Sequence, residues 1–526
     1  MNIHFSGGHA GRQITRAMHR ACLFGAAALL LMAHNQAAAA AKEERTKPNV
    51  VLIIADDLGH NDVSVNGNPL VRTPHIDSIA QNGIRFLAGY SSNAVCSPAR
   101  AALMTGRFQQ RFGFEYTPFL PALRNATRDI ASEDQYDKVD VKEPLPGKED
   151  TGLPASEITI AQLLKQQGYS TALVGKWHLG QGERFSPLKF GFDEFVGYPT
   201  GASLFAEEND PGIVNAKLPW STHDQYLWKN LKHMIMRGAA YEPAKGYSTF
   251  QLRDEAVSFI DRNAETPFFL YLAFTAPHTP LQAPKANYDR LAHITDHKTR
   301  VYYAMIEAMD EAVGSVIAEL KKKGVYDNTI IIFSSDNGGA WYNHIPQMNL
   351  PYRGWKGTFF EGGVNVPYFI QWPAHIPAGA VIEGPASQLD ILPTVVRAAG
   401  GEVPADRKID GIDLMPRMKP GTTDLADRTL FWRVDTYKVI RKGKYKLHVD
   451  ERQKKTWLYD LEIDPTERIN IAEKMPKLAR EMRDALNAVN AEMAAPGWPS
   501  TTRAHRYIDV VSPPYRDGED YVLFAN

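Results

Sequence analysis

Four continuous apolar runs, each followed directly by charged or polar side chains, constrain the fold of this chain more than any other feature. Unbroken apolar runs of strand length are typical of parallel strands that are covered on both faces of a sheet. Because ligands of such sheets bind beyond the carboxyl ends of the strands, the polar residues that follow the runs are expected to meet there. The runs with their polar ends are Asn49 to Gly59, Ser170 to Gly180, Pro267 to Pro280 and Asn328 to Gly339.

Helical patterns separate these runs. Ser156 to Gly168 has a capping serine, apolar positions at helical spacing and a terminal glycine, and Tyr302 to Gly324 is a longer segment with the same stop. Strands that alternate with helices indicate an α/β fold. We therefore expect a large doubly wound mixed sheet that is sandwiched by helices.

The pattern changes toward the C-terminus. Residues 428–526 hold short strand-like segments joined by turns, and a helical pattern runs from about Met475 to Ala494. We expect a smaller C-terminal α+β subdomain with an antiparallel sheet there, and a catalytic α/β domain over residues 42–427. Two loop-rich segments, 109–154 and 181–246, carry no assignment, and long loops inside compact domains are usually functional or disordered.

The N-terminal segment resembles a secretory signal peptide, with spaced arginines, an apolar stretch from Ala21 to Met32 and then small residues. We expect residues 1–41 to be removed and the mature protein to be periplasmic or secreted. The stretch is shorter than the roughly 20 residues of a membrane span, which weighs against the alternative of an anchor, and no later run is long enough. Removal takes Cys22 away and leaves Cys96 alone, so no intramolecular disulfide framework can form.

The charge balance limits the partners. Lysine and arginine total 59 against 60 aspartate and glutamate, which gives a formal net charge of −1. A chain without excess positive charge gives no support to nucleic acid or an anionic membrane as a partner. Any affinity for an anion must therefore be local.

Two oxygen-rich pairs follow two of the apolar runs. Asp56 and Asp57 end the first run, and Asp336 and Asn337 end the fourth. Three carboxylates and an amide oxygen suit a hard cation, and calcium is preferred to magnesium because it tolerates irregular geometry with about six or more oxygens. The alternative for the aspartate pair alone is a turn with a helix-capping carboxylate.

Five basic side chains lie at or beside the same class of strand end. If they converge with the cation and the carboxylates, they form a positive pocket for an anion with several oxygens, such as a sulfate or phosphate ester. The alternatives are satisfied structural histidines and a solvated surface lysine. The five residues are Arg100, Lys176, His178, His278 and Lys356.

Cys96 is a poor ligand for calcium, and an exported thiol without a partner is open to oxidation, so it is either an inert buried residue or a residue that is converted. Its surroundings, CSPARAALMTGR, resemble the signature of the type I sulfatases of the alkaline phosphatase superfamily, Cys-x-Pro-Ser-Arg followed by Leu/Met-Thr-Gly-Arg. Ala99 replaces the serine of that pattern, which leaves the maturation system open. The blocks IIADDLG, GKWHLG, APHTP, SDNGG and KGTFFEGG match the family in order over nearly all of the mature chain.

The resemblance implies an arylsulfatase-like hydrolase of sulfate monoesters, in which a formylglycine-generating maturation enzyme oxidises the cysteine to an aldehyde. The hydrated aldehyde would attack sulfur with one hydroxyl, and a proton lost from the other would expel sulfate. The implied calcium ligands are Asp56, Asp57, Asp336, Asn337 and an oxygen of modified Cys96. The other implied roles are the positioning of the modified residue by Arg100, proton removal by His178 and the binding of sulfate oxygens by Lys176, His278 and Lys356.

The region Tyr352 to Pro373 is similar to sulfatases that act on sulfated galactans, including carrageenan, with glycosaminoglycan sugars as the main competitors. Two alternatives to a carbohydrate sulfatase are a phosphonate or phosphate ester hydrolase on the same fold and a secreted sulfoglycan-binding protein without catalysis. Aromatic side chains in segment 181–246 either form a platform for a sugar or pack the inserted loops. They are Tyr198, Phe205, Trp220, Tyr226 and Trp228.

Overall fold

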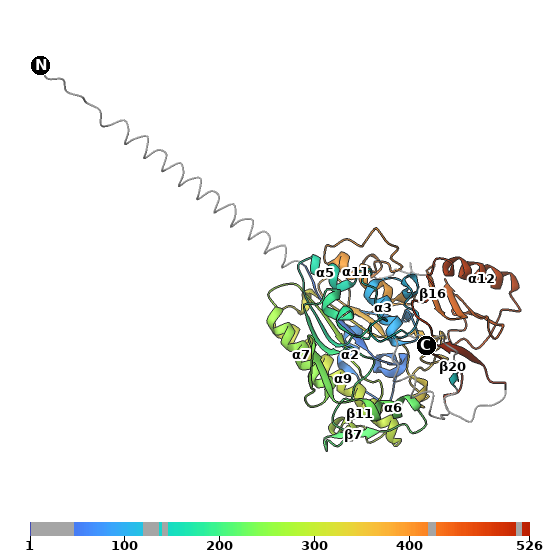
Figure 1. Ribbon diagram of the computed structural model, residues 1–526, viewed down its shortest axis with the longest axis horizontal. Helices are drawn as coiled ribbons and strands as arrows, with labels where there is room; N and C mark the ends of the chain where they lie inside the picture. Colours follow the sequence, from blue (N-terminus) through green and yellow to red (C-terminus); the bar gives the residue numbers. More distant parts are fainter. Residues whose placement is uncertain (2–46, 119–135, 139–145, 419–427, 512–517) are drawn as a thin grey trace. The chain divides into compact units, whose positions relative to one another are not determined.

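The computed structural model describes residue 1 and residues 47–118, 136–138, 146–418, 428–511 and 518–526 (Figure 1). The chain divides into two units, Met1–Lys47 and Pro48–Asn526, and the fold below is that of the second unit. Apart from Met1, the predicted signal peptide lies outside the described residues. Within the described part of the chain, no helix is both long and apolar enough to cross a membrane.

A ten-stranded mixed sheet forms the centre of the second unit. Its middle strands β12, β1, β10, β5 and β6 run parallel, and β13 and β8 join antiparallel on either side. In sheet order the strands are β14 (Ala380–Ile382), β2 (Ile84–Phe86), β13 (Tyr368–Gln371), β12 (Thr329–Ser335), β1 (Asn49–Ala55), β10 (Phe268–Ala273), β5 (Ser170–Lys176), β6 (Glu194–Tyr198), β8 (Met234–Arg237) and β9 (Ala240–Pro243).

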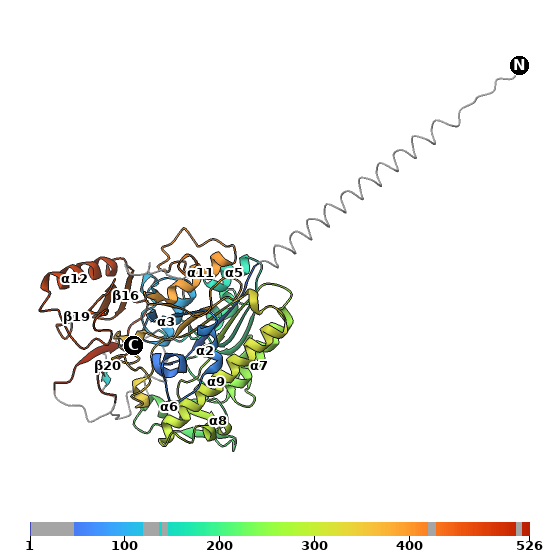
Figure 2. The same cartoon turned by 180° about the vertical axis from the view of Figure 1, so that it is seen from behind.

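Helices cover both faces of this sheet. Alternate residues of β1 belong to two different hydrophobic cores, with Leu52 in one and Ile53 in the other, because successive side chains of a strand point to opposite faces. The expected sandwich is therefore confirmed (Figures 1 and 2). The core of Ile53 includes α2 (Pro74–Gln81), α7 (Ser248–Asn263) and α9 (His297–Lys322), and the core of Leu52 includes α3 (Cys96–Thr105), α5 (Ile160–Gln166) and α11 (Ile391–Ala398).

The C-terminal part contains the expected antiparallel sheet and helix. The four strands are β16 (Thr429–Val434), β17 (Tyr437–Lys442), β18 (Tyr445–Asp450) and β19 (Lys455–Asp460), and the helix is α12 (Pro476–Asn490). The domain boundary at residues 427 and 428 stays a prediction, since residues 419–427 lie outside the described part.

Smaller elements complete the fold. The short sheets pair β3 (Gly89–Tyr90) with β15 (Ala386–Ser387), β7 (Ile213–Ala216) with β11 (Leu281–Pro284), and β20 (Thr502–Tyr507) with β4 (Tyr136–Lys138) and β21 (Tyr521–Ala525). The remaining helices are α6 (Thr222–Asn230), α8 (Lys285–Arg290) and α10 (Glu361–Val364). Segment 181–246, which had no assignment, supplies β6, β8 and β9 of the main sheet together with α6 and β7.

The start of α5 corrects one expectation. The capping residue is Thr159 and not Ser156, because the Thr159 side chain accepts a hydrogen bond from the backbone N–H of Gln162 while the Gln162 side chain accepts one from the N–H of Thr159. This reciprocal pair is a capping box, which satisfies two otherwise unpaired donors. Ser156 therefore lies in a turn before the helix.

A buried charge network attaches β18 to the loop that leads into α10. The Lys446 ammonium is fully buried and lies 2.7 Å from a carboxylate oxygen of Glu361 and 3.1 Å from one of Glu467. Burial alone would raise the pKa of Glu467, but Lys446 and His448 outweigh it and lower that pKa to about 2. Because an unpaired buried charge is costly, these groups depend on one another.

Removal of the Lys446 charge tests this network. In Lys446→Ala both carboxylates lose their cation, and breaking one side of a buried pair costs about 3–5 kcal/mol, so we expect a clear fall in the midpoint of thermal unfolding. The matched control is Lys285→Ala, which removes an exposed partner of Asp289 and should leave the midpoint nearly unchanged. Equal midpoints for the two variants would contradict this account.

Candidate functional site

The predicted meeting of strand ends is present in the fold. β12, β1, β10 and β5 are neighbours in the sheet in that order and run parallel. Their carboxyl ends therefore share one edge, which brings together residues nearly three hundred positions apart. The residues at this edge are Asp336 and Asn337 after β12, Asp56 and Asp57 after β1, His278 beyond β10, and Lys176 and His178 at and after the end of β5.

Helix α3 brings Cys96 and Arg100 to the same edge. Cys96 is the first helical residue and Arg100 follows one turn later, so both side chains lie on one face of the helix. The fully buried guanidinium donates to Asp336 Oδ2 over 2.8 Å and to the carbonyl of Lys176 over 3.1 Å. Arg100 thereby connects the ends of β12 and β5.

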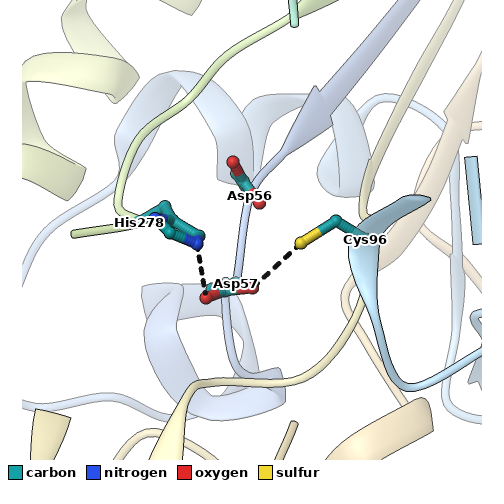
Figure 3. Close-up of side chains that lie close together, drawn as sticks. All are labelled: Asp56, Asp57, Cys96 and His278. Carbon is teal, nitrogen blue, oxygen red and sulfur yellow. Dashed lines mark hydrogen bonds and ion pairs between the residues drawn. The ribbon is translucent and has the colours of Figure 1, made fainter. Parts of the chain in front are cut away.

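The carboxylate of Asp57 is the centre of the site. Lys356 Nζ lies 2.7 Å from Asp57 Oδ1, and the Asn337 amide donates to the same oxygen over 2.7 Å. The Tyr342 hydroxyl donates to Oδ2 over 2.9 Å. His278 Nε2 lies 3.6 Å from the same oxygen, and Figure 3 shows this pair as a dashed line. Burial alone would raise the pKa of Asp57, but the charge of Lys356 outweighs it and holds the pKa below its usual range.

Asp56 forms a second buried ion pair beside the first. Lys176 Nζ lies 2.6 Å from Asp56 Oδ2, and both side chains are fully buried. Burial is the largest influence on this carboxyl and raises its pKa to about 7 despite the attraction of Lys176. The other oxygen, Oδ1, has no hydrogen-bond partner among the residues that the structure describes, and the same holds for Asn337 Oδ1.

Asp56, one of whose oxygens lacks a partner in the described part of the chain, belongs to a buried group of side chains that could hold a cation. A buried oxygen without a donor is costly, and hard cations take carboxylate and amide oxygens as ligands. One oxygen of Asp56 and one of Asp57 lie within 4.8 Å of each other and of atoms of Cys96 and His278. The residues present therefore fit a metal ion at this point (Figure 3).

Both site histidines are held in the neutral form. Burial, together with Lys176, keeps the pKa of His178 well below its usual range, and burial does the same for His278 despite the opposing charge of Asp57. The ring of His178 is tightly enclosed, since a Cβ atom on Gly201 would lie 2.7 Å from it. A neutral imidazole can accept a proton from a reacting group.

Cys96 is buried and held close to a charge. Its side chain lies with Sγ 3.3 Å from Lys356 Nζ and 3.8 Å from Asp57 Oδ1. Burial raises the pKa of this thiol well above its usual value in spite of the neighbouring Lys176 and Lys356. Because the thiolate and not the thiol is the nucleophile, unmodified Cys96 is a weak nucleophile at neutral pH.

Two residues at the site were not identified from the sequence. Tyr342 lies five positions after Asn337, so its closeness in sequence to the predicted strand end is a signal that could have identified it. His223 lies on α6 with its ring centroid 5.8 Å from that of His278 and 5.7 Å from that of Tyr342. No pattern in segment 181–246 marks His223, because α6 reaches the site only through the fold.

Of the two alternatives for the aromatic side chains of segment 181–246, packing applies to two of them. Tyr198 and Phe205 are almost fully buried in the hydrophobic core below the sheet, so they pack the fold and do not face a sugar. Trp220 is partly buried and stacks on His344 with ring centroids 4.7 Å apart. Tyr226 and Trp228 are also partly buried, and for them contact with a sugar stays a prediction.

Two models of protein families match this chain. The model of the Sulfatase family matches residues 48–401, which is more than half of the chain. A second model, described as the C-terminal part of N-sulphoglucosamine sulphohydrolase, matches residues 354–492.

Individual relatives agree with this match. The mouse N-acetylgalactosamine-6-sulfatase is 35% identical, and the alignment covers 76% of this chain and 72% of the relative. The mouse steryl-sulfatase is 33% identical over 74% of this chain and 68% of its own length. Among solved structures, Ps i-CgsB in complex with k-i-k-neocarrahexaose is 31% identical, has a TM-score of 0.73 and is similar over 86% of this chain and 94% of that chain. The chain therefore belongs to the sulfatase family and is a sulfuric ester hydrolase.

Proposed function

We propose that this protein is an exported enzyme that hydrolyses sulfate monoesters on a carbohydrate. The observation that carries the proposal is the convergence of two buried lysines, two neutral histidines and Cys96 around the carboxylates of Asp56 and Asp57. Such a site can hold an anion with several oxygens and can accept a proton beside it. The signal-like N-terminus supports a periplasmic or secreted location.

We propose that calcium binds at the site, where Asp56 Oδ1 and Asn337 Oδ1 accept no hydrogen bond from the residues that the structure describes. The residues that would hold it are Asp56, Asp57, Asp336, Asn337 and an oxygen of converted Cys96. His278 lies near the same point but is left out of this set, since a hard cation prefers oxygen ligands to imidazole nitrogen. When bound, the cation would neutralise the carboxylates and act as a Lewis acid toward an oxygen of the reacting groups.

Conversion of Cys96 to formylglycine by a maturation enzyme is the second part of the proposal. The supporting observation is that the buried thiol itself is a weak nucleophile in a site built for a reactive group. A hydrated aldehyde at this position would supply two hydroxyl groups, one to attack sulfur and one to release sulfate. Arg100, through Asp336, would keep the ends of β12 and β5 in place around it.

The remaining residues divide into anion binding and proton transfer. Lys176 and Lys356 carry the charges that bind sulfate oxygens. The resemblance gives the same role to His278, whose Nε2 can donate to a sulfate oxygen only when the ring is protonated. His178 is neutral and accepts a proton from the converted residue. His278 Nδ1 lies 2.6 Å from the carbonyl of Thr279 and so carries the ring proton, which leaves Lys356 as the better donor to the departing oxygen.

Sulfated sugars are the proposed substrates because of the relatives. One solved neighbour holds a neocarrahexaose, and some of the curated relatives, those of mouse and dog among them, are named N-acetylgalactosamine-6-sulfatase. Sulfated galactans such as carrageenan are therefore the first substrates to test, with glycosaminoglycan sugars as the main competitors. The family assignment favours this function over the phosphonate hydrolase and over the non-catalytic binding protein.

Cation binding is testable without any substrate. After treatment with a chelator, calcium should raise the midpoint of thermal unfolding, since a ligand at a hundredfold excess over Kd adds about 2.7 kcal/mol of stability, and magnesium should raise it less. Asn337→Leu, which removes one oxygen, should reduce the calcium effect, whereas Asn230→Leu on the exposed face of α6 should retain it. An unchanged midpoint with calcium would refute the proposed site.

The fate of Cys96 is measured by mass spectrometry of the peptide that contains it. In protein produced with a maturation enzyme, we expect the mass to be lower by the fixed amount that separates cysteine from formylglycine. Cys96→Ser should still bind sulfated substrate but fail to turn over, because serine lacks the second hydroxyl. Ala99→Ser is the matched variant and should be converted and active. Sustained turnover by Cys96→Ser would argue against this chemistry.

A desulfation screen separates the proposed function from its alternatives. The matured wild-type enzyme should release sulfate from at least one member of a panel of sulfated galactan and glycosaminoglycan oligosaccharides, and should hydrolyse phenylphosphonate more slowly than nitrophenyl sulfate. Lys356→Met should lower kcat/KM on every sulfate ester by roughly a hundredfold or more, because it removes a cation that faces the anion. Faster hydrolysis of phenylphosphonate would favour the phosphonate hydrolase, and no hydrolysis at all would favour a binding protein.

A further inference from the structure

His223 lies at the site without a role in the chemistry described so far. It is the second residue of α6, whose first turn is capped by the Ser221 side chain. Its ring packs edge-on against His278, with ring centroids 5.8 Å apart, and lies 5.7 Å from the ring of Tyr342. His223 therefore borders two of the three side chains that contact Asp57 Oδ2.

The exposure of His223 places it toward solvent. His278 and Tyr342 are buried, whereas His223 is only partly buried. Neither ring nitrogen of His223 makes a hydrogen bond to any residue in the described part of the chain, so both are available to a ligand. Burial, with Lys356 as the next cause, lowers the pKa of His223 to about 4, and a neutral imidazole can donate one hydrogen bond and accept another.

The position of His223 is fixed from outside the site. The indole N–H of Trp220 donates to the carbonyl of Tyr342 over 2.9 Å, and the indole stacks on His344 with an interplanar angle of 8°. Lys298 donates to the carbonyl of His344 over 2.7 Å. The start of α6 is thus attached to the turn that carries Tyr342, which pre-organises His223 for binding.

These positions determine how a bound sulfate ester is oriented in the site. Lys176, one of the two lysines that would bind sulfate, is fully buried, whereas His223 is only partly buried. The sulfate group must therefore enter first, and the alcohol part must point outward, past His223. We propose that His223 is a specificity residue that hydrogen-bonds a neutral sugar hydroxyl or ring oxygen of the alcohol, an inference that rests on the proposed function.

The test compares two substrates on one variant. His223→Ala should lower kcat/KM roughly tenfold or more for the sulfated oligosaccharide that the wild type hydrolyses best, because a sugar group loses its hydrogen-bond partner. The same variant should stay within about threefold of wild type on nitrophenyl sulfate, whose alcohol has no sugar hydroxyls. His223→Gln, which keeps a donor and an acceptor, should recover part of the loss, and Lys229→Ala on the exposed part of α6 should equal the wild type.

Inhibition by products, measured with nitrophenyl sulfate as the substrate, gives a second readout that reports binding of the sugar and not the chemical step. The inhibition constant of the desulfated sugar should rise in His223→Ala, whereas that of inorganic sulfate should not change. An equal loss on both substrates, or an unchanged kcat/KM on the sugar, would overturn the role of His223. Failure of the wild type to hydrolyse any sulfated sugar would instead refute the proposed function itself.

Discussion

The need to compensate buried charge organises this site more than any other interaction. Asp57 has no exposure to solvent, and burial alone would favour its neutral form, yet Lys356 keeps it ionised. The dependence is mutual, since burial would lower the pKa of Lys356 while Asp57 raises it well above its usual value. The charges at the edge of the sheet are therefore stable only as a set, and the set exists only when β1 and the loop carrying Lys356 have both folded.

The same principle extends to the C-terminal sheet, which supplies none of the proposed catalytic residues. Glu467 accepts a hydrogen bond from the backbone N–H of Glu361, and its carbonyl accepts one from Arg353. These two contacts lie on either side of Lys356 in the chain. The buried network around Lys446 thus holds the loop from both ends, which gives the C-terminal part a function in building the site even though it lies far from the sheet edge in sequence.

Sequence reasoning succeeded where strands carry the chemistry. Because β1 and β12 are buried on both faces, their apolar runs are unbroken, and the polar residues after them stand out as strand ends. It failed at the starts of two helices, where polar residues decide the structure. Thr159, and not the nearby Ser156, caps α5 through its pair of hydrogen bonds with Gln162. α9 begins at His297, before the first apolar residues of its pattern, because its first turn is polar. His223 could not be found, because nothing local distinguishes a histidine that reaches a site through packing.

Burial alone would lower the pKa of both Lys356 and His178, yet Lys356 stays charged and His178 is neutral. This difference in protonation lets one pocket perform two tasks. Lys356 remains charged because a carboxylate lies within 2.7 Å, whereas His178 is surrounded by Lys176 and Arg100 and is kept neutral. A charged group binds an anion and a neutral imidazole accepts a proton, so the two tasks require groups in different protonation states at the same pH. The low dielectric constant of the buried site strengthens both electrostatic effects, the attraction of Asp57 for Lys356 and the repulsion of a proton on His178 by the neighbouring cations. A carboxylate in direct contact keeps Lys356 charged, whereas the cations around His178 favour its neutral form, so the type of base and the charges of its neighbours together decide which task each base can carry out.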